Sequence, residues 1–365
     1  MIRSALRKLR ALSSPPVQYV GLKQAASRGP MHVLMPEKHV ETPETTQMTF
    51  EAFSQDLSAP VYTAPAVYTT TLSGARYCST THCVLDKSGA LITESTGPGG
   101  RPLSFPAGTF DRPVKRISGL ATSFRCCFND FYHLLVDNLS RLDLLNFDDF
   151  RSLPSISLLC PTLTPLEAFF VDRLLPNNVT IIKTEPGYLY EPDQFLFNTF
   201  ITRQASGYLR GPYVERLRTR LGLVPSPPRT ERILISRSRA TKGRRVLNEA
   251  ALLEGLRPFG FKRYILEEHS IHEQIDLFHR ADVVVAPHGA GLSHLLFSPH
   301  ASVLELFASP IVLPHYYLLS KALGHDYHFL TGPQTDRDED FTVNVSAVRE
   351  RVEAILSASA SSTEH

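Results

Sequence analysis

The stretch from Ala281 to Leu292 reads ADVVVAPHGAGL and gives the clearest indication of the fold. Its branched apolar run, Val283 to Val285, is typical of a strand buried on both faces of a parallel sheet. Gly289 and Gly291 follow the run, and glycine there permits a tight turn and a close approach of a ligand to the backbone. A helix starting after such a turn directs its free N–H groups and positive dipole end at the ligand, which favours a phosphate. A plain strand-to-helix turn explains the same residues equally well.

The residues around this stretch alternate between strand and helix patterns. Strands are expected at 232–236, 263–266, 282–286, 302–307 and 327–330, and helices at 248–256, 271–279 and 314–323. Asn248 is the expected N-cap of the first helix, and Ser270 with Glu273 forms a capping box for the second. The alternation predicts a doubly wound parallel sheet, with His288 at the mouth of its glycine turn.

A basic loop, SRSRATKGRR at 236–245, follows the first of these strands. It carries five cations in nine positions, namely Arg237, Arg239, Lys242, Arg244 and Arg245. Because ligands bind outside the carboxyl ends of parallel strands, this loop is expected at the same edge as the glycine turn. Arginine forks match phosphate oxygens, so a diphosphate site is the favoured interpretation and a solvated loop is the alternative. No Gly-x-Gly-x-x-Gly or Gly-Lys-Ser/Thr loop follows a strand, which speaks against dinucleotide binding and nucleotide-triphosphate hydrolysis.

Polar residues near the next strand edge are candidates for binding ribose or sugar hydroxyls. They are Glu267, Glu268, Glu273 and Gln274. Helix capping and solvation explain them without a ligand.

Residues 131–145 show a strongly apolar helical pattern that three polar residues cross. His133, Asp137 and Arg141 follow one another at steps of four, which puts them on one helix face. Such groups on a mostly buried helix are costly unless they pair or line a cleft. A ladder of paired charges is the alternative, but the apolar surroundings favour a cleft. There, His133 or Asp137 is suited to remove a proton from a substrate hydroxyl, and the sequence leaves open which of them does so.

The segment PSPP at 225–228 is the best candidate for a linker. With this linker at 225–230, the expected order of parts is a basic tail at 1–30, an N-terminal domain at 31–224, and a ligand-binding domain at 231–335. An acidic loop with a last helix is expected at 336–365. Short β-type runs between turns predict extra β structure in the first part of the N-terminal domain. Strands at 155–160, 179–183 and 188–197 with a helix at 166–174 predict α/β alternation in the rest.

Length and composition bound the class of protein. The chain has 365 residues, 42% hydrophobic and 20% charged, which is an ordinary globular balance and long enough for two domains. A net charge of +2 is too small to predict nucleic acid as a general partner. Five cysteines, an odd number in a large chain, argue against a disulfide framework and for a cytoplasmic location.

The first acidic residue is Glu37, and residues 1–12 place apolar side chains opposite arginines at helical spacing. One interpretation is a basic amphipathic helix that contacts an anionic membrane from its inner face. An organelle transit peptide and a frayed, solvated terminus are the alternatives, and the solvated terminus is slightly favoured. No apolar run approaches the length that spans a bilayer.

As a set, these motifs resemble glycosyltransferase family 61. In chain order they are Tyr132-His133-x-x-x-Asp137-x-x-x-Arg141, Ile235-Ser236-Arg237, Arg244-Arg245-x-x-Asn248-Glu249, Gly260-Phe261, Glu273-Gln274, His288-Gly289-Ala290-Gly291-Leu292 and Glu305-Leu306-Phe307. They span about half of the chain, from Phe124 to Phe307. Leu134, Ser140 and His294 depart from the residues common at those positions in the family.

The resemblance implies a GT-B fold, in which two Rossmann-like domains face a cleft. It implies inverting transfer of a sugar from a nucleotide donor, commonly UDP-GlcNAc or UDP-xylose, to a hydroxyl of a glycan or glycolipid. Because eukaryotic members carry a membrane anchor that this sequence lacks, a bacterial member that makes capsular or other surface polysaccharide is expected.

The expected donor-site residues combine the basic loop with the glycine turn. They are Arg237, Arg244, Arg245, Asn248, Glu273, Gln274, His288, Gly289, Ala290, Gly291 and Leu292, with Arg141, Glu268 and His294 as further candidates. Arg237 and Arg245 are expected on the diphosphate, and His133 or Asp137 on the acceptor side. Since arginines can stabilise a departing diphosphate, no metal or other cofactor is expected, and the Asp-x-Asp triplet at 336–338 is not assigned one.

Two other functions are compatible with the same parallel sheet and are the alternatives. A sugar-nucleotide epimerase of the GT-B type releases UDP without an acceptor, so acceptor dependence separates it from a transferase. A non-catalytic sugar-nucleotide-binding protein binds without turnover.

Overall fold

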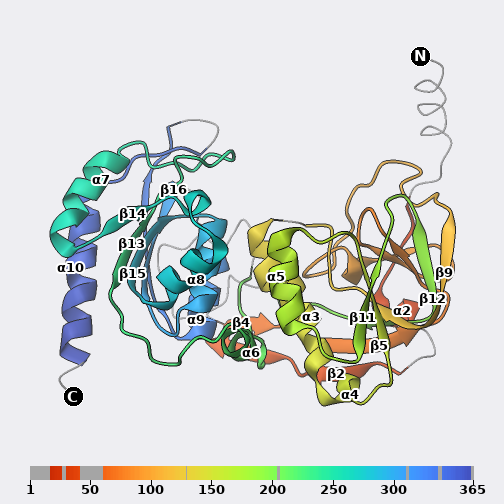
Figure 1. The fold of residues 1–365 in the computed structure, drawn as a ribbon. Coiled ribbons are helices and arrows are strands. Elements are labelled where there is room, and N and C mark those ends of the chain that lie inside the picture. The colour runs from red at the N-terminus through yellow and green to blue at the C-terminus, as the bar shows by residue number, and fades with distance from the viewer. Residues whose placement is uncertain are drawn as a thin grey trace. The chain divides into compact units, whose positions relative to one another are not determined.

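A computed structural model describes residues 17–26, 30–41, 61–128, 130–203, 206–309, 312–335 and 339–362. The amphipathic pattern at residues 1–12 and the triplet at 336–338 lie outside the described residues. The chain forms two compact units, one from Met1–His39 and Thr63–Gln204, the other from Val40–Tyr62 and Ala205–His365. Both combine helices with a sheet that contains parallel strands, which confirms the α/β class (Figure 1).

The second unit contains a five-stranded, entirely parallel sheet in the order β14-β13-β15-β16-β17. Its strands are β13 (Glu231–Ile235), β14 (Lys262–Tyr264), β15 (Ala281–Pro287), β16 (Ser302–Ser309) and β17 (Asp326–Pro333). β15 is buried along almost its whole length, as its unbroken valine run predicts. The parallel sheet expected from the alternation is therefore confirmed.

Helices cover both faces of this sheet (Figure 1). On one face, α7 (Glu249–Leu256) and α10 (Val345–Ser362) pack together over a core that includes Val283, Val285 and Leu304. On the other face lie α8 (Ile271–His279) and α9 (His315–Leu323). The glycine turn leads into a 3-10 helix, Ala290–Phe297, rather than the expected α-helix.

The strand order has a functional consequence. Numbered within the unit, it is 2-1-3-4-5, so the chain leaves the first strand, β13, toward one edge and enters the third, β15, on its other side. In open α/β sheets, ligands bind at this switch point, outside the carboxyl ends of the two strands. The basic loop follows β13 and the glycine turn follows β15, so both lie at that point.

The first unit is built on a ten-stranded mixed sheet. A parallel core consists of β9 (Val114–Thr122), β10 (Ile156–Cys160), β11 (Val179–Lys183) and β12 (Leu189–Asn198). Added to it are β1 (Tyr19–Val20), β2 (His32–Met35), β5 (Val67–Leu72), β6 (Arg76–Cys78), β7 (Val84–Leu85) and β8 (Leu91–Ile92). β5 and β6 pair antiparallel with β12, and β3 (Lys38–Glu41) pairs with β4 (Val61–Ala64) in a separate sheet. Extra β structure before the alternating part is thus observed.

The helical segments of the first unit are short. They are α2 (Leu22–Ala25), a 3-10 turn at Thr93–Ser95, a π-helix at His133–Asn138, α3 (Leu139–Asp143), a 3-10 turn at Leu144–Asn146, α4 (Asp148–Arg151) and α5 (Pro165–Leu174). The single helix expected at 131–145 is therefore three successive types of helical turn. The same segment is buried on nearly all sides, so tertiary packing rather than helix propensity sets its backbone.

The structure differs from two local predictions. The predicted tail at 1–30 contains β1 and α2 in its described part, because Val20 and Leu22 are buried in the core of the first unit. The two units divide between Gln204 and Ala205, and Val40–Tyr62 also belongs to the second unit, so the predicted linker at residues 225–230 lies within that unit. α6 (Tyr213–Arg220) therefore belongs to the second unit, where the Arg218 side chain donates to the carbonyls of Leu296 and Ser298.

The predicted N-terminal caps of α8 and α7 agree with the structure in part. Ser270 and Glu273 form the predicted capping box of α8. Asn248 occupies the N-cap position of α7, but its side chain makes no capping bond. In the part of the chain that the structure describes, no helix has the length and apolarity to cross a membrane.

Candidate functional site

Arg237 and Gly289 meet at the switch point of the second unit. The Arg237 guanidinium lies so close to Gly289 that a Cβ atom added to the glycine would overlap it. The backbone of Gly289 is extended, with φ 164°, so a side chain added there would cause no dihedral strain but would have to push the Arg237 guanidinium aside. Arg237 Nε donates to the carbonyl of Gly243 at 3.1 Å, which ties the two ends of the basic loop together. The arrangement places a guanidinium directly on the glycine turn.

The positive charge at this point is partly buried and reinforced. Burial and the neighbouring Arg244 lower the pKa of Arg237. Arg244 adopts a left-handed backbone, φ 58°, and its Nε lies 3.3 Å from Glu339 Oε2. Two neighbouring arginines beside a glycine turn form a site suited to an anion.

His288 is held from behind by a buried carboxyl group. Its Nδ1 lies 2.5 Å from Glu305 Oε1, and the Tyr327 hydroxyl donates to Glu305 Oε2 at 2.5 Å. The imidazole stacks on Phe307 with ring centroids 5.1 Å apart. Burial, followed by the charges of Arg244 and Arg237, lowers the pKa of His288 to about 3. His288 therefore presents an uncharged, fixed imidazole beside the two arginines.

The remaining residues of the turn serve packing. A Cβ on Gly291 would lie 3.1 Å from Leu266 and 3.6 Å from Ile235, so glycine lets the turn pack closely on the sheet. Leu292 is fully buried in the core, and Ala290 is half-buried.

Arg245 and Asn248 are held by the segment before α10. Arg245 forks onto Asp340, with Nε 2.8 Å from Oδ2 and the backbone N–H donating to Oδ1 at 2.8 Å. Asn248 exchanges two hydrogen bonds with the backbone of Val343, at 2.8 and 3.0 Å. Both contacts anchor residues 339–343 to the chain just before α7, so these two side chains have structural partners.

The residues expected near the ribose also have structural partners. Glu273 completes the capping box, and Gln274 donates to the carbonyls of Leu266 and His269. Glu268 pairs with Arg239 at 2.6 Å. His294 stacks on Phe278 in the core, and burial lowers its pKa to about 4.

In the first unit, His133 and Asp137 form a directed pair. His133 Nδ1 lies 2.6 Å from Asp137 Oδ2, and the Thr202 hydroxyl donates to Asp137 Oδ1 at 2.5 Å. The His133 side chain is 25% exposed and that of Asp137 only 2%. Phe128 stacks on the imidazole with centroids 4.9 Å apart. The carboxylate is therefore enclosed, and the imidazole is the member of the pair that reaches solvent.

The pair favours protonation of the histidine. Burial lowers the pKa of His133, but the hydrogen bond and the charge of Asp137 outweigh it, and the net pKa is raised. A histidine whose Nδ1 is held by a carboxylate offers Nε2 for proton transfer.

Arg141 does not extend this pair. Its Nε donates to the carbonyl of Asn198 at 2.7 Å and Nη1 to that of Arg125 at 3.3 Å. The guanidinium lies over Phe200, and burial lowers its pKa to about 10. Arg141 thus supports the core, and the expected three-residue face reduces to the His133–Asp137 pair.

Thr202, Phe128 and Tyr327 complete these constellations and were not predicted. Thr202 is 65 residues from Asp137 and Tyr327 is 22 from Glu305. Neither position carries a local pattern that marks it, because each becomes a partner only in the folded chain.

Comparison with known proteins places this chain near glycosyltransferases. Residues 131–304 match the model of the family Glycosyltransferase 61, a little under half of the chain, and the match contains both His133–Asp137 and the glycine turn. The EGF domain-specific O-linked N-acetylglucosamine transferase of Drosophila melanogaster is 35% identical over 106 residues, 28% of this chain and 20% of that protein. The Beta-1,2-xylosyltransferase RCN11 of Oryza sativa subsp. japonica is 37% identical over 65 residues, 18% of this chain and 12% of that protein.

The matched segments thus span about a fifth or less of these relatives. Together, the family match and the names of the relatives support a relationship to glycosyltransferase family 61 and support glycosyltransferase activity.

Proposed function

We propose that this protein is an inverting glycosyltransferase that takes a sugar from a nucleotide diphosphate donor and transfers it to a hydroxyl of a glycan. The observation that carries the proposal is the guanidinium of Arg237 on Gly289, at the carboxyl ends of β13 and β15. A diphosphate at this point would accept from Arg237 and Arg244 and from backbone N–H groups of the turn. The same groups would stabilise the diphosphate as it leaves.

The electrostatics of the second unit favour a donor with a diphosphate. Two arginines face a histidine that burial keeps uncharged, and the side chain of Glu305 is held behind that histidine. Burial raises the pKa of Glu305 well above its ordinary value, so the carboxyl group adds little negative charge to the site. The positive charge of the two arginines is therefore not neutralised by the Glu305 carboxyl group.

We assign proton removal from the acceptor to His133, with Asp137 as its positioning residue. Asp137 has both carboxylate oxygens engaged and is enclosed, whereas His133 reaches solvent. Nε2 of His133 would take the proton while Asp137 stabilises the imidazolium that forms. A GT-B arrangement, in which the two units face each other across a cleft, would bring this base to the donor sugar.

The names of the relatives select the donors to be tested. One set of relatives transfers N-acetylglucosamine and the other xylose, so UDP-GlcNAc and UDP-xylose are proposed as donors. The proposed acceptor is a glycan or glycolipid of a surface polysaccharide.

The first experiment measures thermal stabilisation by UDP, GDP, CMP and NAD. A ligand present at about a hundredfold over its dissociation constant adds roughly 2.7 kcal/mol to the free energy of unfolding. UDP is expected to stabilise the wild type, and Arg237→Gln is expected to lose this effect. Arg239→Gln is the matched control, because Arg239 belongs to the same loop but pairs with Glu268.

The second experiment measures transfer from UDP-GlcNAc and UDP-xylose with and without a glycan acceptor. Acceptor-dependent release of UDP is expected. Release of UDP at the same rate without acceptor and without free sugar would point to an epimerase, and stabilisation by NAD alone would contradict the proposal.

A further inference from the structure

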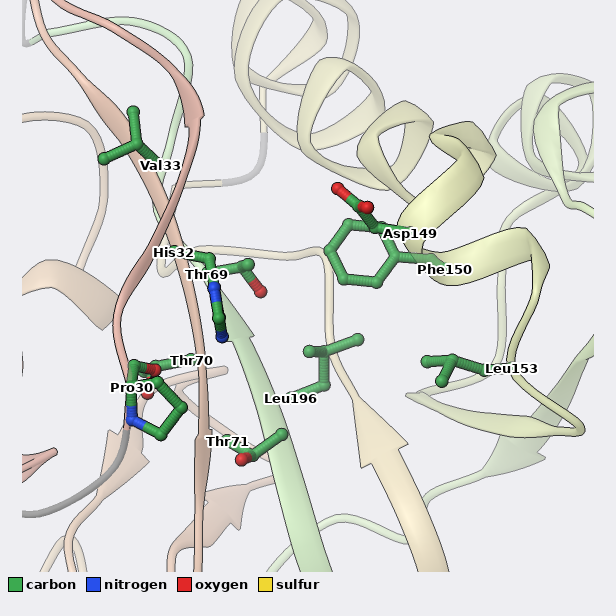
Figure 2. Close-up of a pocket in the computed structure, with 10 residues that line it drawn as sticks. All are labelled: Pro30, His32, Val33, Thr69, Thr70, Thr71, Asp149, Phe150, Leu153 and Leu196. Carbon is green, nitrogen blue, oxygen red and sulfur yellow. Dashed lines mark hydrogen bonds between the residues drawn. The ribbon is translucent and has the colours of Figure 1, made fainter.

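The first unit contains a cavity of about 470 Å³ whose lining residues are separate from those described above. It lies between one face of the sheet, at strands β2, β5 and β12, and the segment around α4 (Figure 2). Its volume falls within the range of roughly 300–1,000 Å³ that small-molecule sites occupy.

The register of the three strands builds the floor of this cavity. His32 pairs with Thr69 across β2 and β5, and Leu196 pairs with Thr71 across β12 and β5. Residues directly opposite each other share a face of the sheet, as do residues two apart on one strand. His32, Thr69, Thr71 and Leu196 therefore stand together on one face.

The opposite wall is apolar and fixed. Phe150 and Leu153 line it, and the side chain of Asn178 donates to both of their carbonyls, at 2.8 and 3.0 Å. Asp149 adds a carboxylate at the exposed rim (Figure 2). The wall thus combines one aromatic ring and one aliphatic side chain with a single carboxylate.

The Thr69 hydroxyl points to a ligand. Thr69 is 6% exposed, and none of the described residues makes a hydrogen bond with its buried Oγ1 atom. Figure 2 shows this oxygen directed toward the space that the lining residues surround. Its neighbour Thr70 satisfies its own hydroxyl on the carbonyl of Pro30 at 3.0 Å. A buried polar atom left without a partner is costly, so a ligand hydroxyl at this position would stabilise the bound state.

From these observations we infer that the cavity is a saccharide-binding site, which takes one pyranose unit with its apolar face against the wall of Phe150 and Leu153 and its hydroxyls toward Thr69, His32 and Asp149. No arginine or lysine is among the described lining residues, which disfavours a phosphate or a nucleotide. A fully apolar ligand would leave the threonine hydroxyl and the carboxylate without partners. A neutral, polyhydroxylated ring with one apolar face matches both halves of the lining.

The test is saturation-transfer difference NMR on the full chain, with methyl β-glucopyranoside, methyl β-xylopyranoside, N-acetylglucosamine and cellobiose as probes. Saturation transfer to at least one of them is expected with the wild type. Thr69→Val, which keeps the side-chain shape and removes the hydroxyl, is expected to weaken binding at least tenfold. Thr71→Trp, at an exposed rim position, is expected to block the cavity without touching the core.

Thr180→Val is the matched control, because Thr180 is an exposed threonine on β11 of the same unit. UDP-induced stabilisation is measured in every variant and reports on the other unit, so failure of the saccharide site and failure of the proposed function are distinguishable. The inference is overturned if no glycoside shows saturation transfer or if folded Thr71→Trp binds the glycosides as well as the wild type does.

Discussion

Arg237 and Gly289 are in such close contact that a side chain on residue 289 would have to displace the Arg237 guanidinium. The two residues follow different strands of one parallel sheet, and their contact marks the point where the strand order reverses. A ligand that binds there meets a guanidinium beside a glycine turn, a combination suited to phosphate.

The first prediction concerns Gly289→Ala. The added methyl group displaces the Arg237 guanidinium, so the charged contact worth about 1.5–3 kcal/mol is lost and affinity for UDP falls roughly 10- to 100-fold. Isothermal titration calorimetry with UDP measures this change. Gly21→Ala serves as control, because a Cβ there meets only Glu94 Oε1, at 3.9 Å. Unchanged affinity in Gly289→Ala would contradict the proposed phosphate site.

The second prediction concerns the pH dependence of transfer. Only uncharged His133 can accept a proton, so kcat/KM rises with pH through a pKa above the ordinary 6.5 of histidine. In Asp137→Asn the carboxylate that contributes most to raising this pKa is gone, and burial, which lowers the pKa, outweighs the smaller effects of Asp130 and Cys127. The rising limb therefore moves to lower pH while the rate falls. A pH–rate profile of both proteins measures the shift. A merely structural Asp137 would lower the rate without moving the limb.

The third prediction separates Arg245 from Arg237. Because Arg245 forks onto the enclosed Asp340, Arg245→Ala lowers the free energy of unfolding by about 1–3 kcal/mol and leaves the UDP-induced stabilisation in place. Urea unfolding with and without UDP tests this, and Asp340→Asn in a double-mutant cycle measures the coupling. If UDP no longer stabilised Arg245→Ala, the result would instead show that Arg245 contributes to binding the diphosphate.

The fourth prediction concerns acid sensitivity through His294. Burial lowers its folded-state pKa from 6.5 to about 4, so the unfolded chain binds a proton there at a higher pH than the folded chain does. Its neutral form stabilises the fold fully above about pH 6.5, and this contribution is lost as pH falls toward 4, by roughly 3 kcal/mol over the whole window.

The comparison for this fourth prediction is His294→Asn, which does not titrate. It is expected to be less stable than the wild type at pH 7, and the difference in unfolding free energy should shrink at pH 4.5. Urea unfolding at the two pH values measures it. A difference that stays constant between them would show that the histidine titrates normally.

Local patterns were sufficient for much of the second unit. Period, β-branching and caps predicted β13 to β17, α8 and α9 with boundaries close to those observed. The sequence was less informative at residues 131–145, where an expected single helix is a π-helix, an α-helix and a 3-10 turn. Hydrophobic periodicity reports which residues are buried, but a segment buried on all sides takes its backbone from its neighbours.

The sequence by itself determined the parallel sheet, the glycine turn and the presence of cations beside it, because strand pattern and turn chemistry are properties of a few adjacent residues. Only the tertiary structure decided which cation reaches the turn. Arg237 lies on Gly289, whereas Arg245 is held by Asp340, 95 residues away. It also decided that Thr202 holds Asp137 and that three strands and α4 enclose a cavity. Such pairings depend on strand register and loop paths across long separations, and no local pattern encodes them.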